Sequence, residues 1–199
     1  MLAFHPLRHE RASPARLAEL LEEFKSLLHR KGMASMDEYG DMLQWGVARE
    51  GGAWRKFHAF HPDWCSFDDR YWGTIHYHAG WIRGTILAGH LEHNTYEAAP
   101  DPAGDRFYQG QPHRLTKHTA QQPQGTVYTL PAMVPHWIKP KALTLTFFEE
   151  EDNGQLGDLI NPVSEETDDH RWTQEQAEAL LPEIVALIDA RLSSLRVTA

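Results

Sequence analysis

The sequence predicts an all-β sandwich or barrel over residues 53–150, with helices before and after it. From Trp54 to about Phe148, short runs rich in aromatic and β-branched residues alternate with clusters of Gly, Pro, Asp and Asn. Outside this region, apolar residues recur at a spacing of three and four, which indicates amphipathic helices. Strands this short and this regularly spaced are typical of sandwiches and barrels.

The expected strands follow directly from these alternating runs. They cover 54–59, 70–77, 81–88, 91–97, 113–118, 125–130, 134–138 and 142–149. In the last of them, Thr144 and Thr146 alternate with apolar residues, as in a half-buried strand. The polar, Pro-containing stretches 98–105 and 119–125 are expected to be loops.

Helices are expected on both sides of the β-region. Residues 13–31 form an amphipathic pattern with Ser13 as the N-cap and Pro14 at the first helical position. A second, short helix is expected at about 36–47, and a C-terminal helix from Thr173 to about residue 195. The chain therefore divides into an N-terminal helical extension (1–52), a β-barrel (53–150), and a linker with a C-terminal helix packed on the barrel (151–199).

Charge and cysteine content exclude several classes of function. The formal net charge of −9 argues against nucleic acid and anionic membranes as partners, because both need a basic surface. A single cysteine, Cys65, allows neither an internal disulfide nor a zinc site built on cysteine pairs. No apolar stretch has the length of a signal peptide or a membrane span, so we expect a cytoplasmic protein.

Histidine is unusually frequent, with 13 residues, and its spacing indicates a metal site. His76 and His78 stand two apart in an expected strand, so both side chains point to one face and can reach one ion. Two unrelated histidines on a polar strand face are the alternative interpretation. In the segment GTVYTLPAMVPHWIKP, Gly125 begins a strand, Pro131 lies in the following turn and His136 begins the next strand.

Taken together, these two segments resemble the two motifs of the cupin superfamily over roughly residues 55–150. The first family motif falls on His76, His78 and Gly89, and the second on Gly125, Pro131 and His136. The resemblance implies a double-stranded β-helix, or jelly roll, with one divalent transition metal bound by His76, His78 and His136. Cupins are often dimers, so the resemblance also implies a homodimer.

The sequence departs from the family motif at the position of its carboxylate ligand. Ile82 and Arg83 stand where the family has Glu, and Met133 replaces the glycine of the second motif. Three neutral imidazoles leave coordination positions open to a substrate and O2, and imidazole suits Fe, Zn, Cu and Ni. In this respect the chain resembles the three-histidine Fe(II) cupins of the diketone, dihydroxyacetophenone and cysteine dioxygenase groups. The resemblance implies Fe(II), with Zn, Mn or Ni as alternatives.

Two further residues are candidates for the site. The dihydroxyacetophenone-type relatives place a carboxylate in the strand after the H-x-H pair, which makes Glu97 the candidate for a fourth ligand. Glu92 lies in the same strand, and an exposed strand glutamate is the other interpretation. Arg83 is the candidate for a clamp on a substrate carboxylate, against a surface arginine paired with a strand neighbour.

Several other side chains near the motifs have two interpretations. Trp81 and Trp137 either wall a substrate pocket or pack in the core. Four other histidines also have two interpretations. They either hydrogen-bond to a metal ligand or act as acid–base catalysts, or they are ordinary surface or hydrogen-bonded histidines; they are His90, His93, His113 and His118. Four histidines have no motif support, namely His5, His9, His58 and His61.

Three functions are consistent with these patterns, and all act on a small molecule. The first is an Fe(II) dioxygenase for a chelating carbonyl, hydroxyketone or thiol substrate. The second is a redox-neutral, metal-dependent isomerase, lyase or hydrolase. The third is a cupin that binds a small molecule without catalysis.

Overall fold

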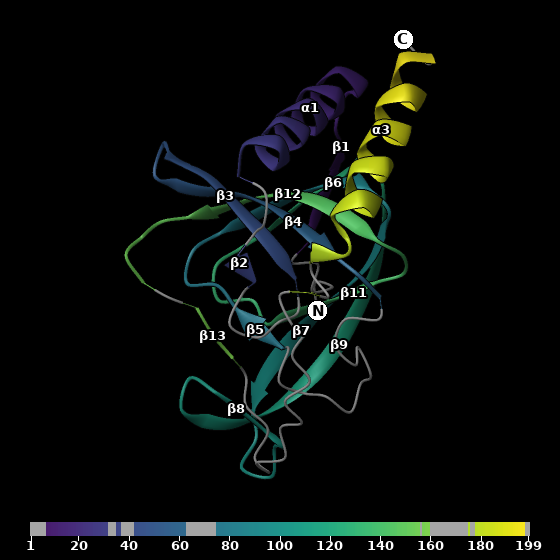
Figure 1. Cartoon of the computed structure of the whole chain (residues 1–199). Helices are drawn as coiled ribbons and strands as arrows, with labels where there is room; N and C mark the ends of the chain where they lie inside the picture. The colour runs from purple at the N-terminus through teal and green to yellow at the C-terminus, as the bar shows by residue number, and fades with distance from the viewer. Residues whose placement is uncertain are drawn as a thin grey trace.

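The computed structural model of the protein describes residues 7–31, 35–36, 42–62, 75–155, 157–159, 175 and 178–197. These residues form two antiparallel sheets and two long helices, α1 and α3 (Figure 1). The elements in chain order are β1 (Arg8–Arg11), α1 (Pro14–Lys31), β2 (Ser35–Met36), β3 (Leu43–Glu50), β4 (Ala53–Phe60), β5 (His76–Tyr77), β6 (Ile82–Ala88), β7 (His90–Pro100), β8 (Arg106–Tyr108), β9 (Gln111–Pro123), β10 (Thr126–Leu130), β11 (His136–Pro140), β12 (Thr144–Glu151), β13 (Asp158–Leu159) and α3 (Leu181–Val197).

The order of the strands defines a jelly roll. The first sheet runs β1-β10-β6-β12-β4-β3-β2 and the second runs β13-β5-β11-β7-β9-β8. Within them, β10-β6-β12-β4 face β5-β11-β7-β9, and the chain passes from one sheet to the other at almost every connection between β4 and β12. Two four-stranded sheets connected in this way form a double-stranded β-helix, the architecture expected from the sequence.

The two faces of the first sheet pack against different partners. Its outer face is covered by α1 and α3, which lie together on one side of the sheets (Figure 1). Phe24 of α1 stacks on Phe57 of β4 with ring centroids 4.5 Å apart, beside Phe147 of β12. The inner face encloses a second apolar cluster inside the barrel, which includes Phe60, Ile82, Ile86, Leu91, Tyr128, Leu130 and Phe148.

The two long helices agree with the sequence pattern. Ser13 caps α1, because its Oγ accepts a hydrogen bond of 3.2 Å from the backbone N–H of Arg16. The apolar stripe of α3 is buried through Ile184, Ile188, Leu192 and Leu195. The expected start of this helix at Thr173 lies outside the described residues. No helix in the described ranges is long and apolar enough to cross a membrane.

The expected second N-terminal helix is wrong where the structure describes that segment, because residue 36 lies in β2 and residues 43–47 lie in β3. Leu43 and Trp45 are both buried while Gln44 between them is only partly so, which is the alternation of a strand. β3 pairs with β4 through the two-residue turn Gly51–Gly52, whose φ angles of 61° and 79° suit glycine. The Gly-Gly pair between two apolar runs was the local signal for this hairpin.

Two expected loops are shorter than predicted. β9 continues to Pro123, and each residue from Gln111 is described as strand, so most of 119–125 is not a loop. Its backbone is paired with β7 as far as His90↔Pro123, and this long-range pairing outweighs the polar local composition. Similarly, β7 runs to Pro100, which shortens the expected loop 98–105. Of the expected strand 70–77, residues 70–74 lie outside the described part of the chain.

Candidate metal centre

Three histidines from two neighbouring strands converge inside the barrel. His76 lies on β5 and pairs in register with His136 at the start of β11, while His78 follows β5 directly. One ring nitrogen from each of the three lies within 4.8 Å of the others. The ring centroids of His76 and His136 are 4.3 Å apart, and His78 lies 5.1 and 5.2 Å from these two. The structure therefore brings together the three residues predicted from the two motifs.

Hydrogen bonds orient two of these rings. The Nδ1 of His78 lies 2.6 Å from Oε1 of Glu150, and Nδ1 of His136 lies 3.3 Å from the carbonyl oxygen of Val134. Each Nδ1–H donates to its oxygen acceptor, which leaves Nε2 with a lone pair for a metal. Burial, with the nearby His76 and His78, holds the pKa of His136 well below its usual value, so the ring is neutral. Three imidazoles this close together, two of them oriented by hydrogen bonds, fit a divalent transition metal.

Glu150 is a member of this site that the sequence interpretation missed. It lies on β12, where its carboxylate contacts His78 and lies 3.5 Å from Nζ of Lys56 on β4. Burial alone would raise the pKa of Glu150, but its hydrogen bond with His78 and the nearby Lys56 lower it below its usual value. From sequence alone, the acidic run 149–152 is typical of a strand end exposed to solvent. The sequence carried one signal for Glu150, namely the alternation of side chains along the strand. Residues 144, 146, 148 and 150 share one face of β12, so Glu150 points the same way as Phe148.

Two more histidines are buried in the barrel near the three-histidine group. His58 on β4 packs against Phe148 with ring centroids 5.0 Å apart, and His93 on β7 lies 5.3 Å from the ring of His136. Burial lowers the pKa of each to about 3, so both are neutral at physiological pH. Within the described part of the chain, Nε2 of each ring has no hydrogen-bond partner. His93 was a candidate from sequence, whereas His58 had no motif signal.

Two observations together decide the fold class: the jelly-roll order of the facing sheets, and the H-x-H pair that begins on β5 beside His136 on β11. The fold is that of the cupins. The position of the histidines inside this barrel is the one implied by the two sequence motifs.

Comparisons with solved structures find cupin enzymes at low similarity. The oxalate decarboxylase of Lactobacillus farciminis has 13% sequence identity and a TM-score of 0.43, over 63% of this chain and 33% of that one. The salicylate 1,2-dioxygenase of Pseudaminobacter salicylatoxidans has 12% identity and a TM-score of 0.38, over 68% and 33%. This chain thus spans about a third of the length of these proteins. No protein-family model and no curated protein sequence matches.

The two candidate carboxylates from the strand after the H-x-H pair lie apart from the three histidines. Glu97 is exposed, and its Oε2 lies 4.0 Å from Nε2 of His118. The pairing of β11 with β7 ends at His136↔Thr95, so Glu97 lies beyond the end of β11. Glu92 has the opposite parity to His93 and forms an ion pair of 2.8 Å with Lys141. Neither carboxylate is therefore placed to join the three-histidine group.

Arg83 also lies away from the group, on the outer face of the first sheet. Its neighbour Ile82 packs inside the barrel, so Arg83 on the same strand points outward. Its guanidinium donates a hydrogen bond of 2.6 Å to Oε1 of Glu10 on β1. This surface ion pair is the second of the two interpretations made from sequence, and a substrate clamp at the three histidines does not fit this position.

The two flanking tryptophans do not wall the three-histidine group together. Trp137 follows His136 on β11 and points to the opposite face, where it is buried with Ile75 and Tyr96. Trp81 has 37% of its surface exposed. Trp137 is therefore a packing residue of the outer face of the second sheet.

The remaining candidate histidines have partners of their own. The ring of His90 lies 2.8 Å from Oε1 of Gln121, and Nδ1 of His113 donates to the backbone oxygen of Gln111 at 2.9 Å. These contacts account for both residues without a role at the metal centre.

Proposed function

We propose that this protein is a metal-dependent cupin enzyme, specifically a mononuclear Fe(II) dioxygenase for a small chelating carbonyl, hydroxyketone or thiol substrate. The observation that carries the proposal is the convergence of His76, His78 and His136 within 4.8 Å. Among the described residues, no carboxylate belongs to this group.

The donor set supports this function in two ways. Three neutral nitrogen ligands occupy few coordination positions, so a bidentate substrate and O2 have room at the same centre. Iron bound there would supply the one-electron chemistry that a reaction with O2 needs. Zinc and nickel also suit imidazole donors, and together with manganese they define the redox-neutral alternative.

Residues around the three histidines fix the orientation of the rings and make part of their surroundings apolar. Glu150 and the carbonyl of Val134 hold the rings of His78 and His136, so that their Nε2 atoms stay directed at a common point. Phe148 lies 5.6 Å from the ring of His78 and belongs to the apolar cluster inside the barrel. An apolar side chain beside the ring lowers the local polarity, which strengthens the hydrogen bonds of the histidines.

Oxygen uptake by the iron-loaded protein tests the proposal. The panel consists of a β-diketone, an α-hydroxyketone and a thiol acid, each measured with wild-type protein and with His76→Ala. We expect uptake with at least one compound, lost in the variant, because removal of an imidazole removes a ligand. His90→Ala is the matched control, since His90 lies outside the group and should leave uptake unchanged.

Two results would contradict the proposed function. Stoichiometric iron without oxygen uptake across the panel argues against a dioxygenase. Turnover that persists without oxygen and with zinc in place of iron identifies the redox-neutral alternative instead.

A further inference from the structure

His93 has an unused polar atom in the interior of the barrel. Its side chain is fully buried, with its ring 5.3 Å from that of His136 and 4.8 Å from that of Tyr128. Within the described residues, its Nε2 has no hydrogen-bond partner. Burying a polar group without a partner costs about 1–3 kcal/mol, so such an atom beside a candidate metal centre indicates a role.

Gln122 determines which nitrogen of His93 carries the proton. Its side chain is also fully buried, on the neighbouring strand β9, and its amide nitrogen lies 3.1 Å from Nδ1 of His93. An amide nitrogen only donates, so Nδ1 is the acceptor and the proton of the neutral ring is on Nε2. The unused atom of His93 is therefore an N–H donor.

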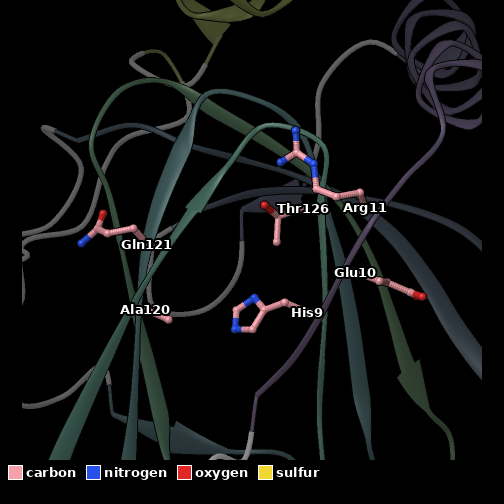
Figure 2. Close-up of a pocket in the computed structure, with 6 residues that line it drawn as sticks. All are labelled: His9, Glu10, Arg11, Ala120, Gln121 and Thr126. Carbon is pink, nitrogen blue, oxygen red and sulfur yellow. The ribbon is translucent and has the colours of Figure 1, made fainter.

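A surface pocket lies at the seam between the two sheets and is lined in part by β9, the strand that pairs with the strand of His93. It has a volume of about 320 Å³ and is lined from β1 by His9, Glu10 and Arg11, and from the opposite side by Ala120 and Gln121 of β9 (Figure 2). Ala120 is the cross-strand partner of His93, so the two side chains share one face of the sheet. In Figure 2, the ring of His9 points from β1 toward Ala120.

His93 is thus linked to the pocket through its cross-strand partner Ala120 and to the three-histidine group through the ring of His136. A small molecule at the three histidines would meet the Nε2–H of His93 as a nearby donor without a protein acceptor.

We propose that His93 is a substrate-binding residue whose Nε2–H donates a hydrogen bond to an oxygen of the ligand at the three-histidine group. Gln122 is the positioning residue that keeps the proton on Nε2. This inference rests on the proposed function and deepens it, because the donor selects ligands with an acceptor oxygen. Carbonyl and hydroxyketone chelators meet that requirement, and an aminothiol does not.

Binding of acetylacetone to the cobalt-loaded full-length protein tests the role of His93. The d–d absorption of Co(II) reports both metal binding and ligand binding without turnover. His93→Leu should weaken acetylacetone binding about three- to tenfold, which is the effect of one hydrogen bond. The affinity for Co(II) and the spectrum without acetylacetone should stay unchanged.

Three variants make the comparison specific. His93→Gln keeps an N–H donor and should recover most of the affinity, which a purely structural role of the ring would not explain. His90→Leu, on the same strand with its ring outside the group, should bind as wild type. Gln122→Leu should weaken acetylacetone binding with Co(II) affinity unchanged, and it serves as the second test if His93→Leu does not fold.

The outcomes separate this inference from the proposed function. Wild-type affinity for acetylacetone in His93→Leu, or in Gln122→Leu if only that variant folds, overturns the role of His93 and leaves the metal centre intact. Loss of Co(II) from His93→Leu also overturns it, because His93 would then support the metal itself. A wild-type protein that binds no cobalt refutes the metal centre and this inference together.

Discussion

The contact between Glu150 and His78 makes the metal affinity depend on a residue that is not a ligand. We consider Glu150→Gln, which keeps the size of the side chain but removes its charge. In the wild type, Oε1 of Glu150 lies 2.6 Å from Nδ1 of His78, a short distance typical of a charge-assisted hydrogen bond. The carboxylate fixes the tautomer of His78 and raises the basicity of its Nε2.

The expected magnitude follows from the burial and the partners of this carboxylate. Loss of such a hydrogen-bond partner lowers metal affinity about 10- to 100-fold, or about 1.4–2.7 kcal/mol. Glutamine retains an oxygen that accepts from His78, so Glu150→Gln should lie near the tenfold end. Glu150→Ala should lie nearer a hundredfold, because it also leaves Lys56, 3.5 Å away in the wild type, without its counter-ion.

Competition with a chromogenic chelator at neutral pH measures this effect for Co(II) or Zn(II). Glu149→Gln is the control, because Glu149 is the adjacent residue and pairs in register with the outward-facing Arg83. The control should bind metal as wild type. If the affinity of Glu150→Gln stays within about twofold of wild type, Glu150 does not orient His78.

Three predictions concern stability. Phe24→Ala should lower the free energy of unfolding by about 3–5 kcal/mol, because Phe24 is fully buried on Phe57; a loss below about 1 kcal/mol in urea titrations contradicts this packing. Gly84→Ala should lower the melting temperature, because its Cβ would lie 2.1 Å from Cζ of Tyr128; an unchanged value contradicts that close approach. His58→Phe should flatten the acid side of the stability profile of the metal-free protein, measured by urea unfolding at several pH values.

The sign of the His58 effect follows from its lowered pKa. In the folded chain the pKa of His58 is about 3, against the usual 6.5 of histidine, so the unfolded chain binds the proton first as pH falls. Stability from the neutral ring is therefore present above about pH 6.5 and declines toward about pH 3, by at most about 1.4 kcal/mol per pH unit. An identical slope in wild type and His58→Phe would show that His58 is not buried in its neutral form.

Local sequence patterns predicted the elements whose own residues determine them. The α1 helix has its cap, its first-turn proline and its apolar stripe within one segment, and the structure confirms all three. Seven of the eight expected strands are confirmed, with ends shifted by up to five residues, whereas the expected strand 70–77 is described as strand only at His76–Tyr77. The metal-site histidines could be identified because their spacing matches the two cupin motifs, which bring distant strands of the barrel together. They are His76, His78 and His136.

Patterns that depend on distant partners were not predictable in the same way. The segment around Trp45 has enough apolar residues for a helix, and its pairing with β4 makes it a strand. Glu150 and His78 are 72 residues apart and belong to facing sheets, so no local spacing joins them. The strand that carries Glu97 was predicted correctly. The sequence did not show that β11 pairs with it only as far as His136↔Thr95, which leaves Glu97 beyond the three-histidine group.

Metal analysis of untagged protein tests the central claim, that His76, His78 and His136 bind one transition metal. The wild type and His136→Ala would be purified without added metal, reconstituted with Fe(II) under anaerobic conditions and measured for metal content. The account predicts about one iron per chain in the wild type and little in His136→Ala, because a ligand is lost. Wild-type protein without metal after reconstitution, or equal metal content in the variant, would contradict it.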